Sequence, residues 1–141
     1  MKYAARMLAI AVTMLPLLAT AQIGNGSKLV TQVPFEFVAG NKTIPAGECI
    51  VRDAGTSMAT VLISNWDSKA STFAIASAGE SQKGTAVNAL VFNKYGDRYF
   101  LSGVKLAGTA TTYHLPVSKA EAELRAQNVV SSEKILLATL Q

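Results

Sequence analysis

The sequence predicts a mainly all-β fold: an antiparallel β-sandwich or closed barrel of about seven to eight strands with one short helix near the C-terminus. Three observations support this class. Short runs of alternating or β-branched residues recur along the chain, turn signals separate them about every eight to twelve residues, and a single segment is rich in helix formers. Neither an internal repeat nor a low-complexity tract interrupts this pattern.

The first half of the chain predicts several short strands. Alternating apolar residues predict a half-buried strand over residues 29–37, in which Pro34 indicates an edge or a bulge. Turns are predicted at Gly40-Asn41 and at residues 45–47, and a polar loop at residues 78–84. The remaining strands of this half are predicted at residues 42–44, 48–53, 60–66 and 71–76.

A β-hairpin is the best-defined element, because two apolar runs, residues 87–95 and 98–107, flank the turn pair Gly96-Asp97. A two-residue turn fixes the register. Counting outward pairs Tyr95 with Arg98, Phe92 with Leu101, Leu90 with Gly103 and Ala89 with Val104. Both faces of the hairpin are apolar over much of their length, which is typical of a central position in a sandwich or barrel. A further strand is predicted at residues 111–115.

The C-terminal part begins with a helix signal. Ser118 and Glu121 form a capping box, in which the Ser118 hydroxyl accepts from the Glu121 N–H and the Glu121 carboxylate reaches back. Strong helix formers continue to about residue 127, and Asn128 is a suitable stop. Residues 129–140 are compatible with a strand or a helix, and we favour a strand that closes the sheet.

The N-terminus predicts export. Lys2 and Arg6 precede an apolar run over residues 7–18, and the small residues Ala19 and Ala21 precede Gln22. The run is shorter than the roughly 20 residues that span a membrane, so it predicts a cleaved signal peptide over residues 1–21. A flexible lead-in at 22–28 and a single β-rich domain at 29–141 would follow, with no transmembrane segment after signal removal, in the periplasm or outside the cell.

Composition excludes some function classes. The formal charge of +4 becomes 4 − 2 = +2 without Lys2 and Arg6, and the other basic residues are scattered singly, which argues against nucleic-acid binding. Cys49 is the only cysteine, so the chain has no intramolecular disulfide. The sequence contains no phosphate loop, nucleophile elbow or dinucleotide motif, and we predict no cofactor.

Candidate catalytic chemistry is sparse. His114 is the only histidine, and together with Cys49 it is too little for a zinc site. A Cys49–His114 dyad is one reading, but Cys49 alternates with Val51 as a small buried residue would. The carboxylates are dispersed, and Asp97 fits the turn of the hairpin. We therefore predict neither catalytic residues nor a metal site.

Three aromatic residues are candidates for surface binding. Trp66, Tyr95 and Tyr99 flank predicted turns, where exposed rings can stack on sugars or on a partner protein. The alternative interpretation is that these rings cover the ends of the core.

Five segments of the chain form a recognisable pattern: VPFEF at 33–37, NKTIPAG at 41–47, LVFNKYGDRYFLS at 90–102, LP at 115–116 and SKAEAEL at 118–124. Through these segments the chain resembles an uncharacterised family of small exported β-rich proteins found mainly in acidobacteria. The resemblance implies bacterial export and a β-rich fold, and it transfers no catalytic residue. Cys49 stands where the family pattern more often has Thr or Tyr, and Lys105 where Trp is common.

The sequence alone leaves the molecular function unassigned between two hypotheses. The first is a non-enzymatic secreted or periplasmic protein that binds an envelope protein or a wall polysaccharide. The second is a small exported hydrolase that uses dispersed carboxylates or Cys49.

The signal peptide gives a direct prediction. Cleavage between Ala21 and Gln22 should leave Gln22 as the N-terminal residue of the exported protein. N-terminal sequencing or intact mass measurement checks this, and a purified protein that still begins with Met1 would contradict it.

Overall fold

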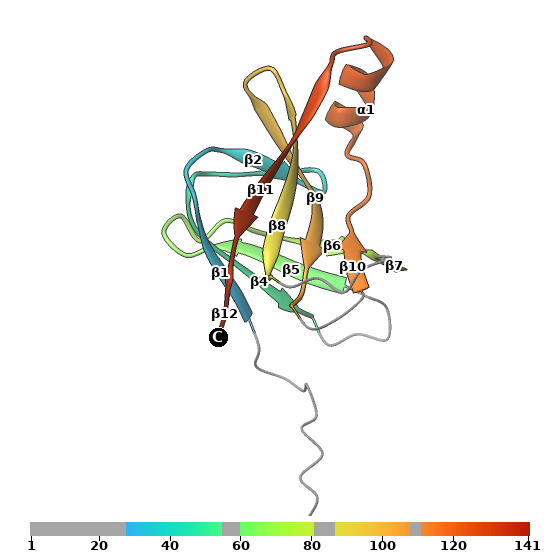
Figure 1. Ribbon diagram of the computed structural model, residues 1–141. Helices are drawn as coiled ribbons and strands as arrows, with labels where there is room; N and C mark the ends of the chain where they lie inside the picture. Colours follow the sequence, from blue (N-terminus) through green and yellow to red (C-terminus); the bar gives the residue numbers. More distant parts are fainter. Residues whose placement is uncertain (1–27, 55–59, 81–86, 108–110) are drawn as a thin grey trace, which may run out of the picture.

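The computed structural model describes residues 28–54, 60–80, 87–107 and 111–141, whose strands form two sheets with one helix at one end (Figure 1). Sheet A has the order β12 (Thr139–Leu140), β1 (Lys28–Val33), β4 (Gly47–Asp53), β5 (Thr60–Asn65) and β6 (Ser71–Ile75). Sheet B has the order β11 (Ser131–Leu137), β8 (Ala89–Tyr95), β9 (Arg98–Lys105), β10 (Thr111–His114) and β7 (Ser77–Glu80). The hairpin of β2 (Phe37–Ala39) and β3 (Lys42–Ile44) joins sheet B through a parallel contact of β2 with β9.

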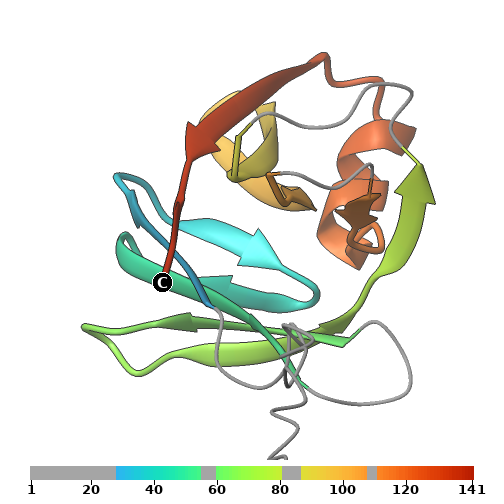
Figure 2. The same ribbon diagram turned by 60° about the horizontal axis from the view of Figure 1, so that its bottom comes forward.

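The fold class predicted from the sequence is confirmed as a β-sandwich. Figure 2 views the molecule with β5 and β6 (green) on one side and β8 and β9 (yellow to orange) on the other. Each sheet ends in edge strands within the described ranges, so the closed-barrel alternative is not the one observed. The described residues form twelve strands, more than the number expected, because several are only two to four residues long.

The core lies between the sheets and follows the predicted alternation. Leu29, Thr31 and Val33 of β1 are buried, and Cys49 and Val51 of β4 face the same core. The largest apolar side chains of this core with no more than 1% exposure come from both sheets and from the β2–β3 hairpin: Phe37, Phe92, Ile44, Ile63 and Leu90. Burying these rings and branched chains supplies the main driving force for folding.

Pro34 divides the strand predicted over residues 29–37. The proline nitrogen has no hydrogen to donate to the ladder, so β1 ends at Val33 and the chain re-enters a strand at Phe37. Phe35, between the two strands, stacks on Tyr99 with ring centroids 3.7 Å apart and meets Phe92 edge-to-face at 5.2 Å. The break thus places an extra aromatic ring at the edge of the core.

The two tight hairpin turns are confirmed. Gly40 joins β2 to β3 with φ +59°, and Gly96 joins β8 to β9 with φ +58°. Glycine adopts this left-handed conformation without the steric cost that a Cβ brings. Both turns therefore close two-residue hairpin loops as the sequence predicts.

The predicted register of the β8–β9 hairpin is right near its turn and wrong farther out. Tyr95 pairs with Arg98 and Phe92 with Leu101, but a register shift then pairs Leu90 with Val104 instead of Gly103. Ser102 is the additional residue, and its Oγ donates to the Val91 carbonyl at 3.1 Å. A β-bulge of this kind has no clear sequence signal, so counting from the turn could not find it.

β7 corrects the loop predicted over residues 78–84. Residues 77–80 pair with β10, while residues 81–84 lie outside the described part of the chain. The chain leaves sheet A at Ile75 and enters sheet B at Ser77, so one nearly continuous extended segment contributes β6 to sheet A and β7 to sheet B. A polar strand that pairs at a sheet edge is hard to distinguish from a loop in the sequence.

The helix signals are confirmed at both ends. α1 spans Lys119–Ala126, and the Glu121 N–H donates to Ser118 Oγ at 3.1 Å. At the C-terminal end Asn128 adopts φ +57°, and the N–H groups of Asn128 and Val129 donate to the carbonyls of Arg125 and Leu124. The Glu121 carboxylate, however, is used elsewhere, as described below.

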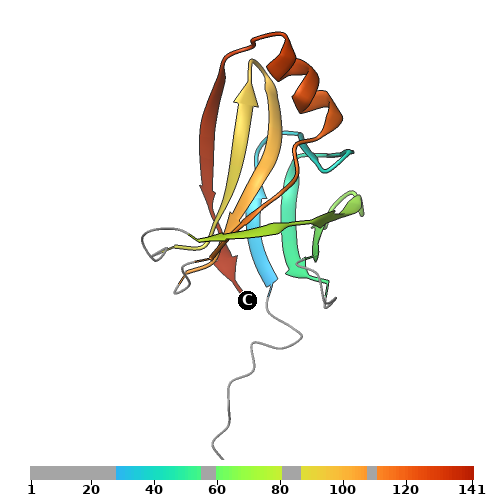
Figure 3. The same ribbon diagram turned by 90° about the vertical axis from the view of Figure 1, so that its right-hand side faces the viewer.

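The C-terminal segment is a strand, as favoured from the sequence. β11 forms one edge of sheet B, and β12 pairs with β1 at the edge of sheet A. Gln141 exchanges backbone hydrogen bonds with Lys28, at 2.9 and 2.8 Å. Figure 3 shows this segment (dark red) running from sheet B to the end of β1 (blue), so it joins the two sheets along one side.

The predicted signal peptide, its cleavage site at Ala21 and Gln22, and most of the lead-in lie outside the described residues. Lys28, the last residue of the predicted lead-in, is already part of β1. Within the described ranges, no helix combines the length and apolar character needed to cross a bilayer.

Candidate functional site: a pocket on sheet B

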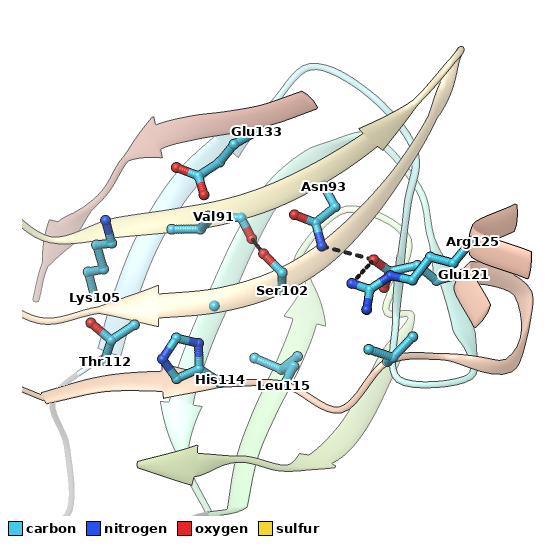
Figure 4. A pocket seen from close by; sticks show the side chains of 12 residues that line it. Val91, Asn93, Ser102, Lys105, Thr112, His114, Leu115, Glu121, Arg125 and Glu133 are labelled. Atoms are coloured by element: carbon cyan, nitrogen blue, oxygen red, sulfur yellow. Dashed lines mark hydrogen bonds and ion pairs between the residues drawn. The ribbon is translucent and has the colours of Figure 1, made fainter. Parts of the chain in front are cut away.

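The two faces of sheet B have different roles. Leu90, Phe92 and Leu101 point into the core, so the alternating Val91 and Asn93 belong to the outer face. α1 covers one end of this outer face. Beside the helix lies a pocket of about 520 Å³, shown from close by in Figure 4.

The pocket combines an apolar part with many polar groups. Val91, Leu115 and Val117 provide the apolar surface, and Asn93, Ser102 and Thr112 provide uncharged donors and acceptors. The titratable residues of the lining are Lys105, His114, Glu121, Arg125 and Glu133. Apart from His114, the lining contains two cations and two carboxylates, whose charges balance.

Glu121 is a buried carboxylate that attaches α1 to sheet B. The residue is 3% exposed, and its Oε1 accepts from Asn93 Nδ2 at 2.8 Å, Tyr95 Oη at 3.0 Å and Arg125 Nη2 at 3.0 Å. A buried charge is tolerated only when opposite charge and hydrogen bonds replace the water it loses. Asn93, Tyr95 and Arg125 meet that requirement.

Arg125 completes this network. Its Nε donates to Tyr95 Oη at 2.9 Å, and its guanidinium forms an i,i+4 ion pair with Glu121. The hydrogen bond to Tyr95, together with the Glu121 carboxylate, raises the pKa of the Arg125 guanidinium above its ordinary value. The helix is thus held on the strand by charge-assisted hydrogen bonds at one wall of the pocket.

The bulge shapes the floor of the pocket. Ser102 and Gly103 follow each other where β9 shifts its register against β8. A Cβ on Gly103 would lie 3.4 Å from the Tyr113 carbonyl oxygen and 3.7 Å from the Val91 Cβ. The missing side chain therefore leaves the floor open at this point.

His114 occupies the opposite wall and depends on a second glycine. A Cβ on Gly79 of β7 would lie 2.8 Å from the His114 Nε2, a distance that real contacts of this kind do not reach. His114 itself is exposed, and in Figure 4 its ring lies across the pocket from Glu133. Gly79 therefore gives the imidazole room to lie beside β7.

The structure separates Cys49 from His114. Cys49 is 1% exposed in the core between the two sheets, whereas His114 lies on the outer face of sheet B. Burial raises the pKa of the Cys49 thiol from 9.0 to about 12, so the reactive thiolate is strongly disfavoured at neutral pH. The Cys49–His114 dyad is therefore not formed.

Two of the three candidate binding aromatics are placed differently from the prediction. Tyr95 is 4% exposed and bonded to Glu121, so the prediction of a surface role for it is wrong. Tyr99 is half-buried on Phe35. Trp66 is 58% exposed, with Lys69 Nζ 4.1 Å from its ring centroid, and it alone of the three retains a largely exposed ring.

The sequence reasoning missed the pocket because its residues are spread from position 91 to position 133. Glu121 was assigned to the helix cap. The signal that could have found its second role is the i,i+4 pair with Arg125, together with the polar Asn93 after the apolar run at 89–92. Within the described ranges no group of three or more His, Cys, Asp or Glu residues could hold a metal ion.

Comparisons of this chain with models of protein families, with curated proteins and with solved structures find no match.

Cys49 gives a pH-dependent prediction. Because its folded pKa lies above its unfolded value, its stabilising contribution is complete below pH 9.0 and is lost as pH rises toward about 12. Over this window the free energy of unfolding should fall by about 1.4 kcal/mol per pH unit more in the wild type than in Cys49→Ala.

Denaturant unfolding of the two proteins between neutral pH and about pH 11 measures this difference. Equal pH profiles, or rapid alkylation of native Cys49 at neutral pH, would contradict the burial of the thiol.

Proposed function

We propose that this chain is a non-enzymatic exported β-sandwich protein that binds an envelope component through the pocket on sheet B, and that this component is a wall polysaccharide. The observation that carries the proposal is the pocket itself, with its charge-balanced polar lining beside an apolar floor. Binding sites commonly combine apolar surface with a few oriented polar groups.

The polar groups favour an uncharged, hydroxyl-rich ligand. Asn93 and Thr112 can donate and accept, as sugar hydroxyls do, and Ser102, whose O–H is bonded to the Val91 carbonyl, can accept. Val91 and Leu115 can meet the apolar face of a sugar ring. A polyanion would meet the carboxylate of Glu133 in the same lining. The balance of charges therefore supports a neutral glycan segment over a phosphate-rich polymer.

Export is part of the proposal and is supported by the sequence. Residues 1–21 have the charged, apolar and small-residue regions of a cleaved signal peptide. The resemblance to small exported proteins of acidobacteria points to the same compartment. A wall polymer is a ligand that a protein meets only after export.

A hydrolase that uses carboxylates is the second candidate, because Glu121 and Glu133 line the same pocket. Its weakness is the environment of Glu121, whose Oε1 already accepts three hydrogen bonds, one of them from a cation. Because Glu121 is 3% exposed and this oxygen already has three partners, its carboxylate is poorly placed to exchange a proton with a substrate.

The test uses the mature protein and soluble oligosaccharides released from purified bacterial cell wall. We expect saturable binding by calorimetry, weakened about fivefold or more in Lys105→Ala and in His114→Ala, since a lost polar contact costs about 1 kcal/mol. Gly79→Ala should weaken binding as well, because the new Cβ displaces the His114 ring. Lys94 lies outside the pocket lining, so Lys94→Ala is the matched control and should bind like the wild type.

Undetectable binding, or pocket variants that bind like the wild type, would overturn the proposal. Shortening of the oligosaccharides that is lost in Glu133→Gln would replace it by the hydrolase. Selective binding of an envelope protein in place of the glycan would overturn the choice of a polysaccharide.

A further inference from the structure

The outer face of sheet A carries an acid, an apolar residue and a base in a row along one strand. Cys49 and Val51 of β4 point into the core, so Glu48, Ile50 and Arg52 belong to the outer face; Arg52 is exposed, Glu48 is half-buried, and Ile50 is only 3% exposed between them. Glu48 and Arg52 are separated by four residue steps, about 13 Å along a strand. The strand is therefore anionic at one end of this face and cationic at the other.

The neighbouring strands repeat the pattern. On β1, Gln32 pairs with Glu48, Val30 with Ile50 and Lys28 with Arg52. At the acidic end Asp67 Oδ2 accepts from the Glu48 N–H at 3.3 Å, and Gln32 Nε2 donates to Glu48 Oε2 at 3.5 Å. Negative charge thus predominates at the end with Glu48 and Asp67, although Lys69 lies nearby over the Trp66 ring, and positive charge predominates at the end with Lys28 and Arg52.

Large apolar side chains are exposed on the other half of this face. Phe73 is 66% exposed and Ile75 is 62% exposed on β6, and Leu62 of β5 pairs with Phe73 on the same side. The Trp66 N–H donates to the Glu48 carbonyl at 2.9 Å, which continues the ladder and places Trp66 beside Glu48. Exposed apolar patches of this kind are typical of interaction surfaces.

α1 is the one helix in the described part of the chain, and its contacts with Asn93 and Tyr95 attach it to β8 of sheet B at one end of the sandwich (Figure 1).

We propose that a second copy of this chain packs on the outer face of sheet A, with a two-fold axis crossing the strands at Ile50. Such an axis reverses the strand direction and keeps β4 over β4. Glu48 of each copy then faces Arg52 of the other, and by the strand registers Gln32 faces Lys28 and Trp66 faces Leu62. The pattern of charges is self-complementary only in this antiparallel arrangement.

The size of the face predicts a weak dimer. Four strands spaced about 4.8 Å apart, each at most about 23 Å long, give a footprint of about 15 by 23 Å. That is about 350 Å², less than half of the roughly 800 Å² that each partner buries in a specific interface. We therefore expect association that depends on protein concentration and weakens with added salt, which screens the charge pairs.

Sedimentation velocity of the mature protein between about 5 µM and 1 mM tests the proposal. Glu48→Arg and Arg52→Glu should each raise the dissociation constant at least about tenfold. In either variant, positions 48 and 52 carry the same charge, and they face each other at two symmetry-related places in the dimer. The double variant Glu48→Arg/Arg52→Glu should restore the dimer, which a loss of folding could not do. Phe73→Ser should weaken it, and Glu123→Arg on α1 is the control for an added positive charge.

A wild type that stays monomeric at the highest concentration would overturn the proposal, as would a double variant no better than the single ones. Dimerisation of Phe73→Ser equal to that of the wild type would also exclude this face. These outcomes are independent of glycan binding, since none of these residues lines the pocket on sheet B.

Discussion

The buried carboxylate of Glu121 is the interaction on which the functional part of the structure depends. α1 has only eight residues, a length at which an isolated helix is marginal in water. Its capped first turn places Glu121 toward Asn93 and Tyr95 of β8, and Arg125 follows one turn later to neutralise the charge. Because α1 forms one wall of the pocket, the site exists only while this network holds the helix on the sheet.

The sequence predicts the local structure well because its signals are local. Gly96 indicates the hairpin turn, Ser118 indicates the start of the helix and Asn128 indicates its end. The structure has all three features. The bulge at Ser102 and the pairing of β7 depend on partners distant in the sequence, and they could not be read from it. The site was missed for the same reason. The carboxylate of Glu121 bonds to Asn93 and Tyr95 because the fold brings α1 onto β8, and the same packing buries Tyr95.

The two sides of the sandwich suggest a division of roles. The proposed glycan pocket lies on the outer face of sheet B, and the proposed contact between copies lies on the outer face of sheet A. Pairing through sheet A would leave both pockets open on opposite sides of the dimer. Two weak sites on one particle bind a repeating polymer more tightly than either alone, since the second contact becomes intramolecular.

Amide hydrogen exchange in α1 measures most directly how far the attachment of the helix to sheet B depends on Glu121. Glu121→Ala removes the hydrogen bonds from Asn93, Tyr95 and the half-exposed Arg125, each worth about 1 kcal/mol, so the helix amides should exchange about a hundredfold faster. The amides of β8 and β9 should stay protected, and Glu123→Ala, which changes an exposed carboxylate of the same helix, should match the wild type. Equal protection of α1 in Glu121→Ala and in the wild type would contradict the role assigned to this carboxylate.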